Sequence, residues 1–435
     1  MTYFECLPGG SLTCSMRVPG DKSMSHRSII FSSIAEGVSN ISGFLEGEDS
    51  LNTLRAFQAM GVDITRDGDK VVVQGVGLHG LKAPTEKLDM GNSGTAMRLL
   101  LGLLAGQTFD SVLVGDESLS GRPMNRVINP LQSMGASIQS EEGGTAPLSI
   151  QGNQKLRSID YKLPMASAQV KSCIMLAGLY ADGETVVTEP APTRDHTERM
   201  LRGFGCKVAS NAGEIRLQGL QTLRATDIDV PADISSAAFF MVAASIAEGS
   251  ELTLEHVGVN PTRTGVIDIL RLMGADIVLS NQTDVGGEPV ADITIRSARL
   301  KGIVIPEELV PLAIDEFPVL FVAAACAEGE TLLTGAEELR VKESDRIQVM
   351  ADGLNILGID AEATADGIRI QGGAFNGGEV ESHGDHRIAM AFSVAALRAQ
   401  APIKINNCAN VNTSFPGFVK LASKAGLRIS NHDSK

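Results

Sequence analysis

Apolar and polar positions follow one pattern that recurs six times along the 435-residue chain. Each occurrence has an apolar helical stretch, a short strand, a second helix ending in an apolar residue plus glycine, and another strand. The second helices end at Met60–Gly61, Met134–Gly135, Phe204–Gly205, Met273–Gly274, Leu357–Gly358 and Ala425–Gly426. Their glycines are 74, 70, 69, 84 and 68 residues apart. This period predicts a compact α/β unit repeated six times, because common solenoid repeats are shorter.

The glycine after each second helix is expected to adopt a left-handed C-cap conformation. The residues that follow are strand-like, at 62–64, 136–138, 207–208, 275–277, 359–361 and 427–429. The first helices, such as Ala237–Ala247 and Val319–Ala327, are apolar on most faces. They are therefore predicted to be buried on most sides.

The first helices begin after Asp, Asn or Ser, the preferred N-cap residues. The six positions are Asp21, Asn92, Ser167, Asp233, Asp315 and Asp385, and a simple cap is one interpretation of each. Lys22, Arg27, Gln169 and Arg387 also fall near these helix starts. A cation is locally unfavourable at a positive helix end, so its presence there indicates a bound anion.

The second helices begin near cations as well, at Arg122, Arg194, Arg263 and the segment Arg340–Arg346. A continuous helix would place Lys342 and Arg346 on one face with Glu343 beside them. A solvated face with internal ion pairs is the alternative interpretation. The recurrence of arginine at matched places in four repeats favours anion binding.

Composition limits the classes of function. The chain carries 37 basic and 52 acidic residues, a net charge of −15, which argues against binding DNA or an anionic membrane. Its few aromatic residues, 4% of the chain, argue against base-stacking surfaces. No long apolar run or signal peptide is recognised, and the six cysteines form no CxxC pair. We therefore expect a cytoplasmic protein with reduced thiols and no zinc or iron–sulfur site.

Six segments, in order along essentially the whole chain, resemble the motifs of the EPSP synthase family, in its bacterial form. They are Pro19–Arg27, Gly91–Arg98, Arg122–Met124, Ala166–Gln169, Arg340–Arg346 and Gly384–Arg387. The resemblance implies an α/β, two-domain enolpyruvyl-transferase fold with six βαβαββ repeats, three per domain, each domain an inside-out α/β barrel. One domain would be discontinuous, comprising residues 1–20 and 233–435, and the other would comprise residues 21–232.

The resemblance also implies a reaction of the shikimate pathway of aromatic amino acid biosynthesis. The enolpyruvyl group of phosphoenolpyruvate is transferred to the 5-hydroxyl of shikimate 3-phosphate by addition and elimination, with release of phosphate. Two phosphates and two carboxylates must be held together while a hydroxyl loses a proton and an enol carbon gains one. No metal or organic cofactor is implied, and we expect a monomer with positive potential concentrated between its domains.

Residue roles carried over from the family fall into three sets. The expected shikimate 3-phosphate ligands are Lys22, Ser23, Arg27, Ser167, Ala168, Gln169, Arg194, Asp315 and Lys342. The expected phosphoenolpyruvate ligands are Lys22, Gly94, Arg122, Gln169, Arg346, His386 and Arg387. The expected catalytic residues are Asp315, which accepts the hydroxyl proton, Glu343, which protonates the methylene carbon, and Lys22 and Lys342, which assist. Gly94 leaves space for phosphoenolpyruvate, and glyphosate is expected to compete for that site.

Some assignments stay open on sequence alone. Glu316 could serve as the functional acid in place of Asp315. His383 and His386 could suggest a metal, but no third ligand is nearby in the sequence. Some family members carry a lysine just before the Phe-Pro segment near the C-terminus. Here that stretch is Val411–Pro416 and holds no lysine, so a phosphoenolpyruvate contact from it is in doubt.

Two rival functions remain. A related enolpyruvyl transferase acts on UDP-N-acetylglucosamine, but it typically has a catalytic Cys or Asp in a loop that corresponds to Val114–Arg126, where this chain has no Cys. A ligand-binding relative without catalysis is the second alternative. The acids Asp315 and Glu343 argue against it, because anion binding alone would not favour two negative charges.

Overall fold

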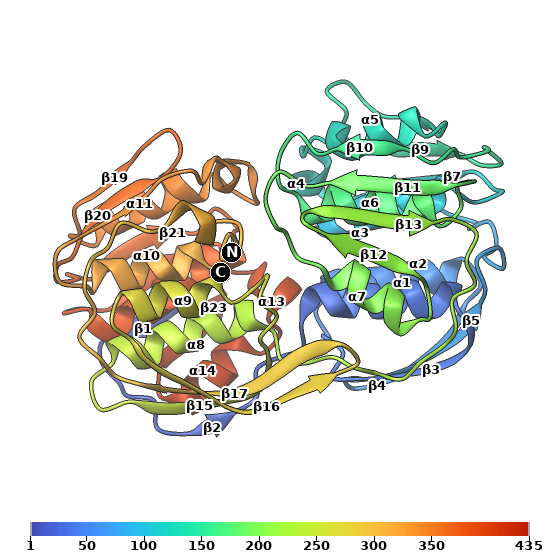
Figure 1. Cartoon of the computed structure of the whole chain (residues 1–435). Coiled ribbons are helices and arrows are strands. Elements are labelled where there is room, and N and C mark those ends of the chain that lie inside the picture. The colour runs from blue at the N-terminus through green and yellow to red at the C-terminus, as the bar shows by residue number, and fades with distance from the viewer. Residues whose placement is uncertain (1, 434–435) are drawn as a thin grey trace. The chain divides into compact units, whose positions relative to one another are not determined.

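The computed structural model describes residues 2–433, which fold as two compact units (Figure 1). Unit 1 comprises the chain up to Pro19, Pro231–Asp284 and the chain from Pro289 onward. Unit 2 comprises Gly20–Val230 and the short segment Val285–Glu288. The sequence pattern contained no indication that this short segment belongs to unit 2.

Unit 2 contains three similar repeats, each with its own four-stranded sheet. The strands run in the orders β14-β3-β5-β4, β6-β7-β9-β8 and β10-β11-β13-β12. In every sheet the first strand pairs parallel with the second, and the remaining pairs are antiparallel. The elements are α1 (Lys22–Ile34), β3 (Glu36–Ser42), α2 (Glu48–Ala59), β4 (Asp63–Asp67), β5 (Lys70–Val76), β6 (Leu88–Asp89), α3 (Gly94–Leu104), β7 (Ser111–Val114), α4 (Glu117–Ser120), α5 (Asn125–Ser133), β8 (Ser137–Gln139), β9 (Leu148–Gln151), β10 (Asp160–Lys162), α6 (Ala168–Gly178), β11 (Glu184–Thr188), α7 (His196–Gly203), β12 (Val208–Asn211), β13 (Glu214–Gln218) and β14 (Ile228–Asp229).

Unit 1 repeats this plan with sheets ordered β16-β17-β15-β2, β18-β20-β19 and β21-β22-β1-β23. Strand β1 pairs antiparallel with both β22 and β23, so the start of the chain completes the last repeat. The elements are β1 (Thr2–Leu7), β2 (Ser15–Met16), α8 (Ile234–Ile246), β15 (Glu251–Gly258), α9 (Gly265–Leu272), β16 (Asp276–Val285), β17 (Glu288–Arg296), η1 (Glu307–Leu309), α10 (Phe317–Ala325), β18 (Glu330–Leu333), η2 (Glu337–Val341), α11 (Arg346–Ile356), β19 (Ala361–Ala363), β20 (Ile368–Gln371), β21 (Gly378–Glu381), α12 (His386–Ala395), η3 (Ala396–Arg398), β22 (Ile403–Asn406), α13 (Val411–Ser414), α14 (Phe418–Ala425) and β23 (Arg428–Asp433).

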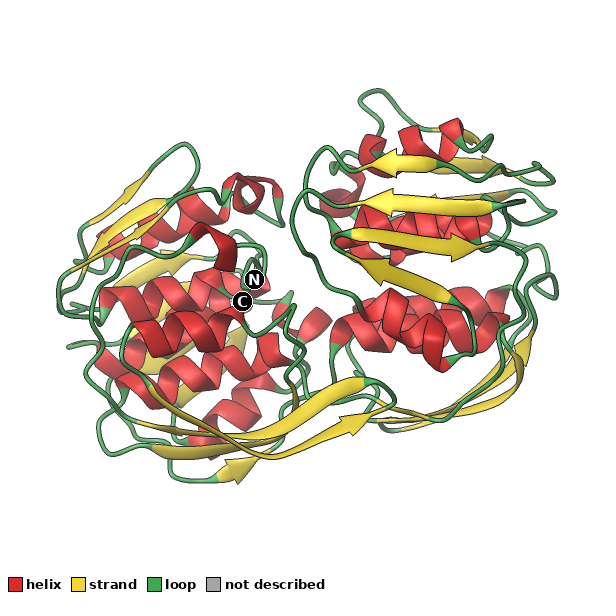
Figure 2. Ribbon diagram, in the orientation of Figure 1, coloured by secondary structure: helices red, strands yellow, loops and turns green. Residues whose placement is uncertain are grey.

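The first helix of each repeat lies in the core of its unit. Helices α3 and α6 pack on each other and α1 contacts α3 in unit 2, while α8, α10 and α12 pack together in unit 1. Every residue of α8 and α10 is buried, as their apolar sequences predict. In unit 2, strands lie over the helices α3 and α6 (Figure 1 and Figure 2). The sheets of both units remain separate rather than closing into one barrel. Each unit therefore has its own hydrophobic core.

The helix ends agree with most of the predicted caps. All six predicted C-cap glycines have positive φ, from +85° at Gly61 and Gly205 to +123° at Gly426. Five of the six first helices have a side chain that caps the N-terminus, contributed by Asp21, Ser93, Ser167, Asp233 and Asp385. The cap interpretation is wrong for Asn92, because the next residue, Ser93, caps α3. It is also wrong for Asp315, because Glu316 takes the N-cap position of α10 and makes no capping hydrogen bond. None of the described helices has the length and apolarity needed to cross a membrane.

Candidate active site

The start of α1 presents Lys22 and Ser23, both half-buried. Asp21 accepts a hydrogen bond from the amide of Met24 at 2.8 Å, which fixes where the helix begins. The ammonium of Lys22 contacts Asp49 Oδ2 at 2.7 Å. Lys22 is therefore held at a positive helix end by a neighbouring carboxylate.

One turn further along α1, the guanidinium of Arg27 is almost completely enclosed. It is 3% exposed, and Nε donates to Thr197 Oγ1 at 2.8 Å. Its two other nitrogens donate to the carbonyl of Ser23 at 2.9 Å and to Ser172 Oγ at 2.7 Å. These bonds fix the plane of the guanidinium, as recognition of a carboxylate by two parallel hydrogen bonds requires.

Two arginines flank the start of α3. A Cβ atom placed on Gly94 would lie 2.8 Å from Arg98 Nη1 and 3.4 Å from Arg122 Nη1. Arg122 also donates from Nη2 to Asn92 Oδ1 at 2.9 Å. The absence of a side chain on Gly94 thus lets two guanidinium groups approach the positive end of a helix. This arrangement can bind an anion.

The side chain of Gln169 joins the starts of α3 and α6. Its Oε1 accepts from Arg98 Nη1 at 2.7 Å, and its Nε2 donates to Thr95 Oγ1 at 2.9 Å. Ser167 caps α6 and Ala168 is its first residue, whereas Arg194 is half-buried two residues before α7. The expected ligands of unit 2 thus cluster at the beginnings of its helices.

His26 supports these helix starts from inside the unit. It is fully buried, with Nδ1 2.7 Å from Thr53 Oγ1 and Nε2 3.4 Å from Ser93 Oγ. Burial, assisted by the charges of Lys22 and Arg27, lowers the pKa of His26 to about 3. His26 is therefore a neutral link between α1, α2 and the cap of α3.

In unit 1, the guanidinium of Arg346 is surrounded by carboxylates. It is 1% exposed, with Nε 2.8 Å from Asp385 Oδ2, Nη2 2.6 Å from Glu343 Oε2 and Nη1 3.4 Å from Asp315 Oδ1. Burial opposes its charge, but the three carboxylates outweigh burial and raise the pKa of Arg346 above its usual range. The cluster brings together Asp315 and Glu343, the two predicted proton-transfer residues.

The structure separates Asp315 from its neighbour Glu316. Asp315 is half-buried, and Arg387 contacts it twice, through its carbonyl at 3.0 Å and through Oδ2 at 3.9 Å. Glu316 is 2% exposed, accepts a short hydrogen bond from Ser235 and lies 3.8 Å from Arg263. This geometry favours Asp315 as the functional acid, because the carboxylate of Glu316 is enclosed in the core.

The segment around Lys342 differs from the prediction of one helix. Helix η2 ends at Val341 and α11 begins only at Arg346, because Asp345 caps it by accepting from the amide of Gln348 at 3.1 Å. Lys342 instead pairs with Glu338 at 2.6 Å. The prediction that Lys342 and Arg346 share one helical face is therefore wrong. The break leaves Glu343 in a loop, where its side chain is 24% exposed.

The two histidines of the Gly384–Arg387 motif occupy different environments. His386 is buried at the first position of α12, while His383 is exposed with φ of +53°. Within residues 2–433, no group of three or more His, Cys, Asp or Glu side chains is arranged to hold a metal ion.

Known proteins resemble this chain along nearly its whole length. The model of the EPSP synthase (3-phosphoshikimate 1-carboxyvinyltransferase) family matches residues 7–421. A 3-phosphoshikimate 1-carboxyvinyltransferase of Alkalilimnicola ehrlichii is 67% identical, over 99% of this chain and 97% of the relative, and one of Methylococcus capsulatus is 64% identical, over 98% of each. A solved EPSP synthase from Acinetobacter baumannii is 60% identical, covers 100% of both chains and superposes with a TM-score of 0.90.

The chain belongs to the EPSP synthase family. This membership decides against the related transferase that acts on UDP-N-acetylglucosamine. It also agrees with the two-domain α/β fold that the six motifs implied.

Three supporting side chains of this EPSP synthase family member were not found from sequence. Thr197 and Ser172 hold Arg27, and Glu338 holds Lys342. Thr197 and Ser172 are ordinary hydroxyl residues inside helices, so no local pattern singled them out. Glu338 precedes Lys342 by four residues and could have been found as a charge pair.

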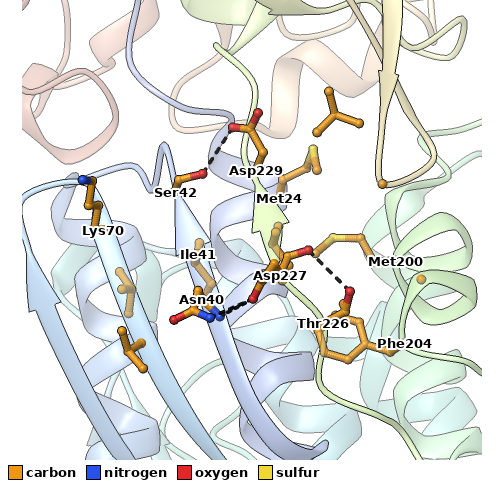
Figure 3. Close-up of a pocket in the computed structure, with 16 residues that line it drawn as sticks. Met24, Asn40, Ile41, Ser42, Lys70, Met200, Phe204, Thr226, Asp227 and Asp229 are labelled. Atoms are coloured by element: carbon orange, nitrogen blue, oxygen red, sulfur yellow. Dashed lines mark hydrogen bonds between the residues drawn. The ribbon is translucent and has the colours of Figure 1, made fainter.

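Unit 2 also has a cavity of about 480 Å³ beside the first turn of α1 and strands β3 and β5 (Figure 3). Met24, Met200 and Phe204 form part of its apolar wall, and Asp227 and Asp229 lie along one side. Asp227 accepts from Asn40 Nδ2 at 2.8 Å. None of the predicted substrate ligands lines this cavity, although Met24 in the first turn of α1 does.

Proposed function

We propose that the two units divide the work of the reaction, unit 2 mainly holding substrates and unit 1 mainly moving protons. The chain is a 3-phosphoshikimate 1-carboxyvinyltransferase. It transfers the enolpyruvyl group of phosphoenolpyruvate to the 5-hydroxyl of shikimate 3-phosphate and releases phosphate. The observation that carries the division is the acid cluster around Arg346, which contrasts with the cations at the helix starts of unit 2.

Shikimate 3-phosphate is held chiefly by unit 2. Arg27 and Ser23 bind its carboxylate side, since the guanidinium of Arg27 is locked in one plane. Ser167, Ala168 and Gln169 bind the phosphate through hydroxyl, backbone and amide groups at the start of α6, and Arg194 supplies positive charge. Asp315 and Lys342 complete the set from unit 1.

Phosphoenolpyruvate binds the cations of both units. In unit 2, Arg122 lies beside the helix start at Gly94, and Gln169 bonds to Thr95 in its first turn, so amide and guanidinium groups there favour a phosphate. Lys22 adds positive charge to this set. In unit 1, the expected phosphoenolpyruvate ligands are Arg346, His386 and Arg387. Glyphosate, which also carries a carboxylate and a phosphonate, competes for these groups.

Proton transfer is assigned to the acids that contact Arg346. Asp315 accepts the proton of the 5-hydroxyl as the hydroxyl oxygen attacks the enol carbon, while Glu343 delivers a proton to the methylene carbon. In the elimination step, the resulting methyl group returns a proton to Glu343 as phosphate leaves. Lys22 assists from a place near the reacting hydroxyl and phosphoenolpyruvate, and Lys342 holds the substrate and shares in the proton transfers.

The assay of the purified protein with both substrates tests this function. Phosphate release should require phosphoenolpyruvate and shikimate 3-phosphate together, and mass spectrometry should identify 5-enolpyruvylshikimate 3-phosphate. Phosphate release with UDP-N-acetylglucosamine but none with shikimate 3-phosphate would refute it. We further propose that the protein works as a monomer in the cytoplasm, which sedimentation of the purified protein and fractionation of cells would test.

A further inference from the structure

A buried lysine lies just behind the proposed phosphate-binding residues of α6. Lys171 follows Gln169 by two positions and is 0% exposed, one of the largest fully buried side chains in the chain. Burial of an ammonium group is costly unless nearby groups compensate its charge. The role of Lys171 therefore depends on which groups surround it.

The ammonium of Lys171 bridges two carboxylates from the region that carries Arg194. Nζ lies 2.7 Å from Glu198 Oε1 in the first turn of α7 and 3.0 Å from Glu189 Oε2 just after β11. The hydroxyl of Thr193 donates to the other oxygen of Glu189. These contacts hold both ends of the connection Glu189–Asp195, in which Arg194 follows Thr193 directly.

Neighbouring hydroxyl groups fasten the same two helices independently. Thr197 Oγ1 donates to Ser172 Oγ at 2.8 Å, and Arg27 donates to both of these oxygens. Helices α6 and α7 therefore remain joined through Thr197 and Ser172 even without the lysine. Lys171 adds an ion pair with Glu189, which links α6 to the connection before α7.

We propose that Lys171 is a positioning residue for shikimate 3-phosphate, holding Arg194 in register with the phosphate-binding start of α6. This proposal rests on the proposed function, because it assumes that Arg194 and Ser167–Gln169 bind the same phosphate. The lysine does not touch the substrate. It acts through Glu189 and Glu198, which fix the backbone on either side of Arg194.

The buried cluster has the properties of a positioning device. One ammonium serves two carboxylates, and burial raises the pKa of Glu189 even though the charge of Lys171 acts to lower it. A buried cluster of one ammonium and two carboxylates lowers stability unless the charged groups lie at favourable distances and angles. A purely apolar core at this place would pack α6 against α7 without restraining the connection Glu189–Asp195.

The first experiment replaces Lys171 by methionine, which has a similar length and no charge. We expect the KM for shikimate 3-phosphate to rise at least about tenfold, while kcat and the KM for phosphoenolpyruvate stay within about twofold. Lys155→Met is the matched control, since Lys155 is exposed in the same unit. A folded Lys171→Met protein with an unchanged KM for shikimate 3-phosphate would overturn the proposal. A purely structural role would reduce the active fraction and leave KM unchanged.

A double variant tests whether the lysine acts through Arg194. Arg194→Ala alone should raise the KM for shikimate 3-phosphate, and adding Lys171→Met should then change it by less than about twofold. Multiplication of the two effects would show that the residues act separately, and would contradict the proposal.

A milder variant keeps the test valid if Lys171→Met does not fold. Thr193→Val removes only the hydroxyl that bonds to Glu189, and should raise the KM for shikimate 3-phosphate about threefold with kcat unchanged. An unchanged KM in this variant would also count against the proposal. Failure of the proposed function is distinguished because the unsubstituted protein would then show no turnover.

Discussion

Arg27 in unit 2 and Arg346 in unit 1 are both buried arginines near the start of a helix, yet their surroundings differ. The hydrogen bonds described for Arg27 run to two hydroxyl groups and a carbonyl. Arg346 is surrounded by the carboxylates of Asp315, Glu343 and Asp385. Both are at most 3% exposed, so the difference lies in the chemistry of the partners rather than in burial.

This comparison shows two uses of the same cation. The hydroxyl and carbonyl oxygens around Arg27 orient its guanidinium, which suits recognition of an anionic substrate. The guanidinium of Arg346 instead serves as the counter-charge for its three carboxylates, and so keeps these acids close together despite their repulsion. We therefore expect substitutions at Arg27 to change substrate affinity, and substitutions around Arg346 to change stability and turnover.

The largest effect is expected for Arg346→Met. Removal of the guanidinium leaves Asp385 buried, and Asp315 and Glu343 partly buried, without their counter-charge. This should lower the free energy of unfolding by roughly 3–5 kcal/mol at neutral pH. Turnover should also be lost. Urea unfolding and phosphate release would measure both, and the stability deficit should shrink at acidic pH as the carboxylates become protonated. A stability loss no greater than that of Arg27→Met would contradict the comparison.

The second prediction concerns Asp315→Ala. Loss of the proton acceptor should reduce kcat by about 10²–10⁴-fold, the usual contribution of general acid–base catalysis. Calorimetric affinity for shikimate 3-phosphate should stay nearly unchanged. Glu316→Gln provides the contrast, because its enclosed carboxylate should affect thermal stability more than kcat. The opposite pattern would reassign the acid to Glu316.

Arg27→Lys should act on affinity alone. An ammonium group cannot reproduce the planar pair of hydrogen bonds, so binding of shikimate 3-phosphate should weaken by roughly 1.5–3 kcal/mol, about 10- to 150-fold. Steady-state kinetics should show this as a higher KM with kcat little changed. A fall in kcat at saturating substrate would show that Arg27 also takes part in the chemical step.

Gly94→Ala should have a smaller effect that depends on the ligand. The new methyl group would lie 2.8 Å from Arg98 Nη1, and the flexible end of that side chain can move away. We expect the KM for phosphoenolpyruvate to rise by about fivefold or less, and the inhibition constant for glyphosate to rise further. Competition kinetics would measure both, and a variant as sensitive to glyphosate as the parent would contradict the proposed competition.

The smallest effect concerns His26, whose pKa of about 3 lies below its ordinary value of 6.5. Between these values the unfolded chain binds the proton that the folded chain excludes, so His26 contributes stability above pH 6.5 that is lost as the pH falls. From pH 6.5 to 5.5 the loss should be about 1 kcal/mol. Urea unfolding would measure the free energy of unfolding at both pH values, and the parent should lose about 1 kcal/mol more than His26→Gln. Equal losses in the two proteins would show that His26 can be protonated in the folded chain.

Local sequence predicted the repeated framework well. Glycine at Gly61 and Gly135 and the caps at Asp21 and Asp233 act within a few residues of their own position, so spacing along the chain suffices to find them. The prediction of one helix across Lys342 was wrong because it overlooked a cap of the same local kind. Asp345 is itself a cap, and its short-range hydrogen bond begins a new helix there.

The sequence by itself determined the six α/β repeats, the apolar inner helices and the polar residues at the helix starts, because each depends on periodicity or on near neighbours. Only the tertiary structure decided which charges meet. Arg346 contacts Asp315 and Asp385, which are 31 and 39 residues away in the sequence. Lys171 pairs with Glu189 and Glu198, which follow the next strand. Such pairs form where packing of the core brings separate helices together, and no local pattern specifies them.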